Sequence, residues 1–176
     1  PKILLTDIIN INADASCLSS EWWLKMLKGK TDSYLCNWLS VYIKLRKKAS
    51  LGLTGATIAY MRIHNPESID LINKHRNIFE IILRPFAHDI ALLRSNEGFK
   101  LNLEAGIKTL KKEFGSYQNY FLPPEFMLTN EQVHILKQYN VAGAFINASR
   151  FKNEIRDRLP EKPYYVKGLM EAELKC

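Results

Sequence analysis

The chain has 176 residues, a length that suits a single domain over residues 1–176, and 47% of them are hydrophobic while 24% are charged. This composition excludes a disordered chain, and no apolar run approaches the roughly 18–20 residues that would span a bilayer. The 25 basic and 18 acidic residues give a net charge of +7, which permits anionic partners without requiring them. Three cysteines, widely spaced, predict reduced thiols and a cytoplasmic protein rather than a disulfide framework.

Short apolar runs alternate with amphipathic segments along the chain. The first run begins at Ile3 and leads into Asp7, which the sequence places at the end of a buried strand. Strands are predicted for 3–9, 50–54, 78–83, 117–122, 141–146 and 164–166. Helices are predicted for 19–30, 33–48, 65–76 and 99–114, and a last one begins where Thr129 and Gln132 form a capping box. The order predicts one α/β domain built from parallel strand–helix units.

An open sheet and a barrel both satisfy this alternation. No glycine-rich phosphate loop follows a strand, so nucleotide binding by an open sheet has no support in the sequence. Polar residues recur just after predicted strand ends, which in a βα barrel meet at one mouth. They are Asp7, Thr54, Arg84 with His88, Glu125 and Asn147. The sequence therefore favours a barrel.

Three polar clusters are candidates for chemistry. Asp7, followed by Asn10 and Asn12, suits a metal ligand, a base or a sugar contact, although an Asx turn explains the same residues. In the loop 84–89, Arg84 could bind an anion, and His88 beside Asp89 could act as an acid, a base or a metal ligand. The alternative is that Asp89 starts a helix and His88 packs under the loop.

Glu125 is the sharpest candidate because it follows Pro123 and Pro124 at a strand end, where the backbone is rigid. Fixed geometry is what a carboxylate needs if it is to attack an anomeric carbon, whereas a favourable charge at the coming helix N-terminus is the alternative. The basic run 44–48 lies at a predicted helix C-terminus without interleaved aromatic residues, so nucleic-acid binding is not expected. The other histidines, His64, His75 and His134, are interpreted as structural.

From about Leu51 to Ile146 the chain resembles the superfamily that joins family 57 glycoside hydrolases and NodB-type polysaccharide deacetylases. The similar segments are FEIILRPFAHDIALL, the helix ending in KKEFG, and YFLPPEFMLTNEQVHILKQYNV. This resemblance implies an incomplete (β/α) barrel of seven strands and a carbohydrate-active hydrolase acting on an oligo- or polysaccharide.

The glycosidase branch implies a retaining glycosidase or transglycosidase in which Glu125 is the nucleophile and a second carboxylate is the acid/base, with no cofactor. Asp7 and His88 would complete the catalytic set, and Arg84, Asp89, Asn10, Asn12 and Thr54 would contact substrate. The early His-x-His motif of this branch is replaced by Asn10-Ile11-Asn12.

The deacetylase branch implies a divalent metal such as zinc, held by Asp7 and His88, that activates water against an amide. Arg84 stands where this branch has its first histidine, and Glu125 follows a motif that differs from the deacetylase one. A third hypothesis is a degenerate barrel that binds glycan without turnover. The sequence predicts about six strands where seven are expected, and it offers no residue for the second carboxylate. Both observations indicate a truncated or partial barrel. The sequence does not indicate the oligomeric state.

Overall fold

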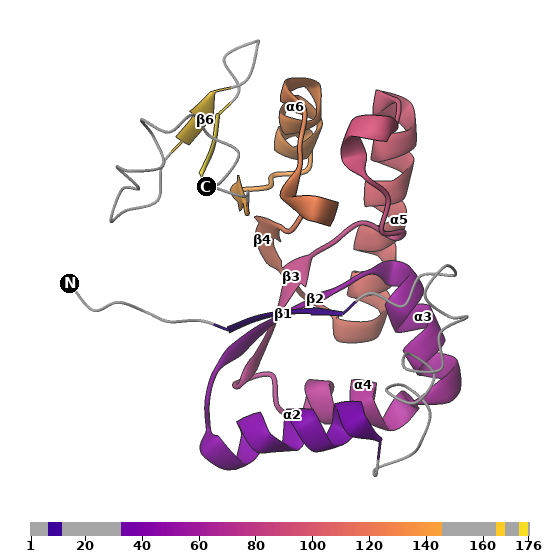
Figure 1. Cartoon of the computed structure of the whole chain (residues 1–176), viewed down its shortest axis with the longest axis vertical. Coiled ribbons are helices and arrows are strands. Elements are labelled where there is room, and N and C mark those ends of the chain that lie inside the picture. The colour runs from indigo at the N-terminus through magenta and orange to yellow at the C-terminus, as the bar shows by residue number, and fades with distance from the viewer. Residues whose placement is uncertain (1–6, 12–32, 146–164, 168–172, 176) are drawn as a thin grey trace, which may run out of the picture.

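The computed structural model describes residues 7–11, 33–145, 165–167 and 173–175. Five strands form a parallel sheet in chain order, and this sheet is a half-barrel (Figure 1). They are β1 (Asp7–Ile11), β2 (Ala49–Leu53), β3 (Phe79–Leu83), β4 (Gln118–Phe121) and β5 (Gly143–Ala144). Beyond β5 the sheet continues with β7 (Glu173–Lys175), which runs parallel to β5, and β6 (Tyr165–Lys167), which runs antiparallel to β7.

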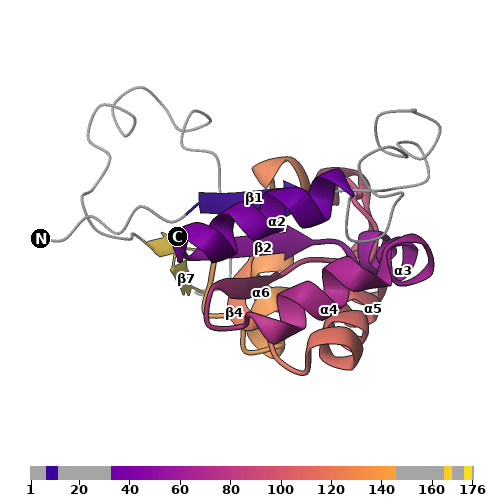
Figure 2. The ribbon, with the colours of Figure 1, turned by 90° about the horizontal axis from the view of Figure 1, so that it is seen from below.

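The helices lie along one face of the five parallel strands, as the two perpendicular views show (Figures 1 and 2). They are α2 (Tyr34–Leu45), α3 (Gly55–His64), α4 (Pro66–Lys74), α5 (Asn96–Phe114) and α6 (Asn130–Gln138), with short 3₁₀ turns at η1 (Ala91–Leu93) and η2 (Pro124–Phe126). Each helix between two neighbouring parallel strands is the crossover that parallel pairing requires. The predicted α/β class with parallel strand–helix units is therefore confirmed.

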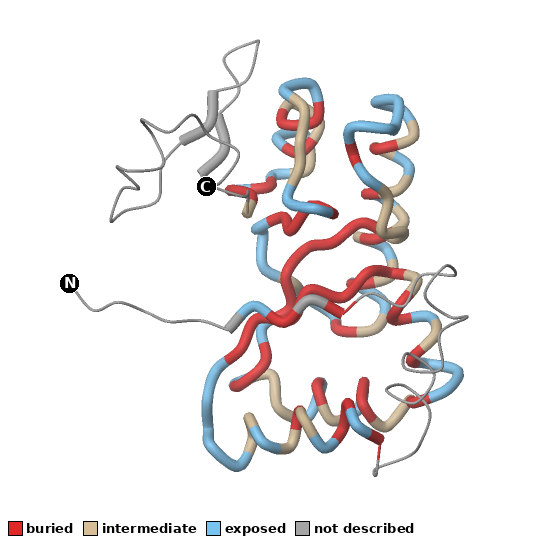
Figure 3. The backbone as a smooth tube through the Cα atoms, viewed as in Figure 1, coloured by how far each residue is buried: buried red, intermediate tan, exposed pale blue. Residues whose placement is uncertain are grey.

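The hydrophobic core lies between the sheet and these helices, and β2 and most of β3 are buried (Figure 3). All five residues of β2 are buried, as expected for a strand covered on both faces. On β3, Phe79, Ile81 and Leu83 face the helices, whereas Glu80 and Ile82 face the opposite side. That opposite side is the interior face of the half-barrel, where Glu80 and Ile82 line an open hollow of about 230 Å³.

Local signals in the sequence fix several helix ends. Asn65 caps α4 by accepting a hydrogen bond from the Ser68 N–H, and Pro66 occupies the first turn. Thr129 and Gln132 form the predicted capping box of α6. Gly115 ends α5 with φ 72°, a conformation that favours glycine. In the described part of the chain, no helix has the length and apolarity that a membrane span needs.

Four expectations need correction. β1 begins at Asp7 instead of ending there, because residues 7–11 pair in register with β2. α3 was not predicted, α5 begins three residues earlier under the cap of Ser95, and the fifth strand is only two residues long. The predicted helix 19–30 lies outside the described residues.

Candidate functional site

The candidate site is built on the segments that follow β3 and β4, at the carboxyl edge of the sheet. Arg84 comes directly after β3, and its side chain is fully buried. Arg84 has the same strand parity as Glu80 and Ile82, so its side chain leaves the sheet on the interior face. Gly52 of β2 lies beside it: a Cβ at Gly52 would make an ordinary contact of 3.5 Å with the Arg84 Cδ but would stand only 2.6 Å from the Leu122 Cδ2. The sheet thus places a buried guanidinium under the mouth of the half-barrel.

The loop after Arg84 is held by backbone hydrogen bonds on two sides. At the start of α3, the N–H groups of Gly55 and Ala56 donate to the carbonyl oxygens of Pro85 and Phe86, at 3.2 and 2.8 Å. From the other side, the Phe86 N–H donates to the carbonyl oxygen of Asn102 on α5, at 2.9 Å. These contacts fix the backbone of the loop before any substrate binds.

Asn102 fixes the next residues with its side chain. Its Oδ1 accepts from the Ala87 N–H at 2.7 Å, and its Nδ2 donates to the Ala87 carbonyl at 3.1 Å and to Asp89 Oδ2 at 3.2 Å. The backbone of α5 can approach so closely because Gly106, one turn further on, has no side chain. Sequence analysis missed both residues, although a mid-helix Asn and a Gly spaced i, i+4 on the apolar face of 99–114 were a usable signal.

His88 joins Arg84 to Glu125. Arg84 Nη2 lies 2.6 Å from His88 Nδ1, and His88 Nε2 lies 3.1 Å from Glu125 Oε1. The exposed fraction rises along this series, from 0% for Arg84 to 18% for the His88 side chain and 56% for that of Glu125. The three residues therefore form a chain of contacts that runs from the protein interior to an accessible carboxylate.

Glu125 has an unusual backbone. Its φ and ψ are 52° and 18°, and Phe126 also has a positive φ, of 55°. Left-handed conformations cost a non-glycine residue roughly 1–2 kcal/mol, and two successive ones are maintained only where the surroundings impose them. Here Pro123 and Pro124 lead into the turn, and their carbonyl oxygens accept from the N–H groups of Phe126 and Met127. Strain of this kind is typical of functional sites.

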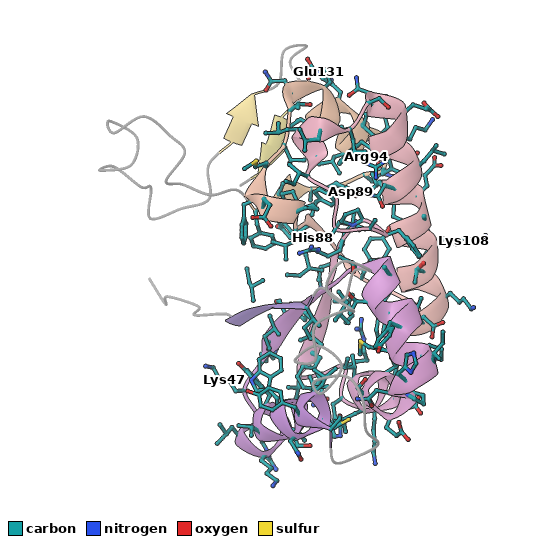
Figure 4. All side chains as sticks on the ribbon, turned by 45° about the vertical axis from the view of Figure 1, so that its right-hand side comes forward. Lys47, His88, Asp89, Arg94, Lys108 and Glu131 are labelled. Carbon is teal, nitrogen blue, oxygen red and sulfur yellow. The ribbon has the colours of Figure 1, made fainter. Side chains whose placement is uncertain are left out.

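Asp89 belongs to the same loop but points to a different partner. Its carboxylate lies 2.6 Å from Nη2 of Arg94, just after η1, and it also accepts from Asn102. Figure 4 shows His88, Asp89 and Arg94 grouped beside α5. Asp89 thus holds the loop in place, and its predicted role in substrate binding stays a prediction.

Of the remaining predicted residues, the structure describes the backbone of Asp7 and Asn10 and the whole of Thr54. Asp7 is the first residue of β1, at the amino edge of the sheet, roughly 13 Å of strand away from the carboxyl edge at Ile11. Asn10 lies within β1 opposite Gly52, and Asn12 falls outside the described residues. Thr54 is fully buried as the N-cap of α3, where its Oγ1 accepts from the Thr57 N–H. Thr54 therefore supports the start of a helix, and its predicted contact with substrate stays a prediction.

A divalent metal does not fit the residues at this site. Both ring nitrogens of His88 already have partners, and one of these is the guanidinium of Arg84 at 2.6 Å. A metal on Nδ1 would have to displace a buried cation, and Asp7, its predicted second ligand, starts at the opposite edge of the sheet. Among the residues that the structure describes, no group of three His, Cys, Asp or Glu side chains could hold a metal ion.

Comparison with protein families identifies the chain. The model of glycosyl hydrolase family 57 matches residues 17–172. The chain belongs to this family. The match includes the loop after β3 and the Pro-Pro-Glu turn after β4, so the predicted resemblance to family 57 is confirmed. No curated protein matches the sequence significantly.

Solved structures confirm the relationship at the level of the fold. The 4-alpha-glucanotransferase of Thermococcus litoralis has a TM-score of 0.74 at 14% identity, over 97% of this chain and 26% of that one. A candidate polysaccharide deacetylase of Mycobacterium smegmatis has a TM-score of 0.70 at 14% identity, over 97% and 56%. A CE4 family pseudoenzyme of Bacillus anthracis has a TM-score of 0.56 at 15% identity, over 80% and 42%. This family 57 chain spans about a quarter of the glucanotransferase.

Proposed function

We propose that this chain is a retaining glycosidase or transglycosidase acting on an oligo- or polysaccharide, with Glu125 as the nucleophile. The observation that carries the proposal is the state of Glu125: an accessible carboxylate on a strained turn at a strand end, with one oxygen hydrogen-bonded to His88. Membership of family 57 supports the same chemistry. We also propose that the half-barrel is the incomplete seven-stranded (β/α) barrel expected from the resemblance, and that no cofactor takes part.

The mechanism follows from which oxygen is held. His88 binds Oε1, so Oε2 is the atom that attacks the anomeric carbon. A bond forms between Oε2 and the anomeric carbon as the bond from that carbon to the leaving oxygen breaks. The leaving oxygen keeps the electron pair of the broken bond and receives a proton from an acid. Water or a sugar hydroxyl then displaces Glu125 and gives its proton to the same group, now a base. We assign this acid/base to none of the described residues.

The turn positions Glu125 for this attack without further ordering. A carboxylate on a fixed backbone, held by a histidine whose side chain is only 18% exposed, has little conformational freedom left to lose when substrate binds, and such preorganisation lowers the barrier. The Glu125 side chain is nevertheless accessible enough to meet a sugar. A salt bridge at a solvated helix end would show neither the strained backbone nor the buried support.

The test is covalent trapping with 5-fluoro-α-glucosyl fluoride. Fluoride leaves without protonation, so the first step depends on the nucleophile and not on the acid/base, while the ring fluorine slows hydrolysis of the adduct. The α-glucosyl probe is chosen because a structural neighbour is a 4-alpha-glucanotransferase. We expect one adduct per chain by mass spectrometry, located on Glu125 by peptide mapping.

Two variants give the comparison. Glu125→Gln should abolish labelling, whereas Glu131→Gln, which changes an exposed glutamate at the start of α6, should label like the parent chain. Labelling that persists in Glu125→Gln would remove Glu125 from the nucleophile position. Glycan binding without any labelling would favour the degenerate barrel, and a stoichiometric divalent ion lost in His88→Gln would favour the deacetylase.

A further inference from the structure

The proposed mechanism gives Arg84 no role, although it belongs to the chain of contacts that ends at Glu125. It is fully buried, a rare condition for an arginine. Within the site, its Nη2 lies 2.6 Å from His88 Nδ1. Arg84 can therefore act on the reaction through His88.

The direction of this hydrogen bond follows from chemistry. A guanidinium has five N–H donors and no acceptor, and it stays charged at all ordinary pH values. Nδ1 of His88 must then be the acceptor, so it carries no proton. In a neutral imidazole the proton stands on the other nitrogen, Nε2, and Nε2 is the atom that lies 3.1 Å from Glu125 Oε1. His88 therefore donates to the carboxylate.

We propose that Arg84 is a positioning residue that fixes the tautomer of His88, so that Nε2–H is aimed permanently at Oε1 of Glu125. The inference rests on the proposed function for its catalytic meaning, but the tautomer itself is a property of the protein without substrate. With the opposite tautomer, Nε2 would present a lone pair to the carboxylate and repel it. With Arg84 in place, one oxygen of Glu125 is held and the other is directed to substrate.

The surroundings keep Arg84 in this position. Gly52 of β2 lies beside its stem, where even a Cβ would make only an ordinary contact of 3.5 Å with Cδ, and the backbone on either side of Arg84 is hydrogen-bonded. The Leu83 carbonyl accepts from the Leu122 N–H at 2.9 Å, and the Pro85 carbonyl accepts from Gly55. The guanidinium is therefore a fixed element of the fold, as a positioning group has to be.

The tautomer is measured by ¹H–¹⁵N correlation spectra of the histidine rings at neutral pH, with His88 assigned from the signals that His88→Gln removes. We expect Nε2 of the protonated type and Nδ1 of the unprotonated, hydrogen-bonded type. Detection of Nδ1–H, or of protons on both nitrogens, would overturn the inference.

A second variant separates Arg84 from the other candidate cause, Glu125. In Glu125→Ala the acceptor for Nε2–H is gone, and the exposed position makes unfolding a minor concern. If Arg84 fixes the tautomer, the His88 signals keep their type in this variant. If they change type, the carboxylate sets the tautomer and the inference fails.

The catalytic consequence is tested with Arg84→Met, which removes the donor but keeps much of the volume. We expect labelling of Glu125 to slow by about 10- to 100-fold, as is common when a supporting hydrogen bond is lost, and Arg84→Lys to recover part of the loss. Arg62→Met, which removes an arginine that pairs with Glu113 away from the site, should label normally. A normal rate in Arg84→Met would overturn the positioning role. Correct tautomers in a parent chain that is never labelled would instead refute the proposed function alone.

Discussion

Gly106→Ala probes how tightly the catalytic loop is held. A Cβ at Gly106 would stand 2.8 Å from the carbonyl carbon of Pro85 and 2.9 Å from the nitrogen of Phe86, and closer still to the carbonyl oxygen of Arg84. These are backbone atoms, so no side-chain rotation relieves the contact. The loop and α5 must separate by about 1 Å, which is overpacking of the kind that costs about 1–3 kcal/mol.

The separation also breaks hydrogen bonds. Phe86 N and Ala87 N lie 2.9 and 2.7 Å from the two oxygens of Asn102, and a shift of about 1 Å lengthens both bonds beyond good geometry. Each lost bond costs about 1 kcal/mol, and the better helix propensity of alanine returns about 1 kcal/mol. The net destabilisation is about 2–4 kcal/mol. A displacement of this size near the reacting groups can also slow labelling of Glu125 by about 100-fold.

The assay is denaturant unfolding followed by circular dichroism, together with the rate of covalent labelling. Gly98→Ala is the matched control, because Gly98 lies on the same helix and its Cβ would meet only the Ser95 Oγ at 3.2 Å and the Arg94 stem at 3.7 Å. We expect this control to be neutral or slightly stabilised and to label normally. The reasoning fails if the two alanine variants are equally stable and label equally fast.

Two other predictions concern the scaffold. Asn65→Ala should lower the free energy of unfolding by about 1–3 kcal/mol, because Asn65 is fully buried, caps α4 and donates to Ser33 Oγ at 2.7 Å. A midpoint of urea unfolding unchanged from the parent chain would contradict this. The hydrogen bond to Glu104 raises the pKa of Tyr139 to about 12, from 10.0. The folded state keeps this proton longer than the unfolded state, so the stabilisation is complete below pH 10 and is lost as the pH rises through 12. Titration of the Tyr139 ring by NMR should show this pKa, and Glu104→Ala should return it toward 10; an unchanged titration would contradict the assignment.

The parts of the fold that were predictable are those with local causes. The cap and proline at Asn65 and Pro66, and the capping box at Thr129, act within one turn and are legible in the sequence. The first strand was predicted at 3–9, several residues before β1, because apolar residues recur from Ile3 to Ile11 and do not themselves show which residues pair. Pairing in register with β2 selects residues 7–11. α3 was missed because its first turn begins with the small residues Gly55 and Ala56, and only the packing of Phe86 against Gly55, which has no room for a Cβ, explains the glycine.

The same division applies to the site. Glu125, Arg84 and His88 were candidates because polar side chains after parallel strands meet at one edge, and the structure brings these three together. Asp7 is the first residue of β1 in the structure, at the amino edge of the sheet, so the same argument does not place it beside these three, and its predicted role stays a prediction. The contact between His88 and Glu125 joins residues 37 positions apart, so no local pattern encodes it.

The backbone strain at Glu125 makes a prediction whose sign is unusual. At an ordinary helical position alanine is more stable than glycine by about 1 kcal/mol, as Ala105→Gly in the middle of α5 should show. At position 125, φ is 52°, a conformation that destabilises the folded state by roughly 1–2 kcal/mol for a residue with a Cβ but not for glycine. Glycine loses about 0.5–1 kcal/mol more through the flexibility of its unfolded chain, so Glu125→Gly should be more stable than Glu125→Ala by up to about 1 kcal/mol.

Both variants remove the carboxylate and should therefore remain unlabelled, which separates the stability effect from chemistry. The unfolding midpoints of Glu125→Gly and Glu125→Ala, measured beside those of Ala105→Gly and the parent chain, show which residue is more stable at position 125. If alanine proves more stable than glycine at 125 as well, the turn relaxes without its glutamate, and the left-handed conformation is a consequence of the bond to His88. If Glu125→Gly is the more stable variant, the fold imposes the left-handed conformation. The parent chain then holds its carboxylate toward substrate at a cost in stability, as expected for a site selected for function.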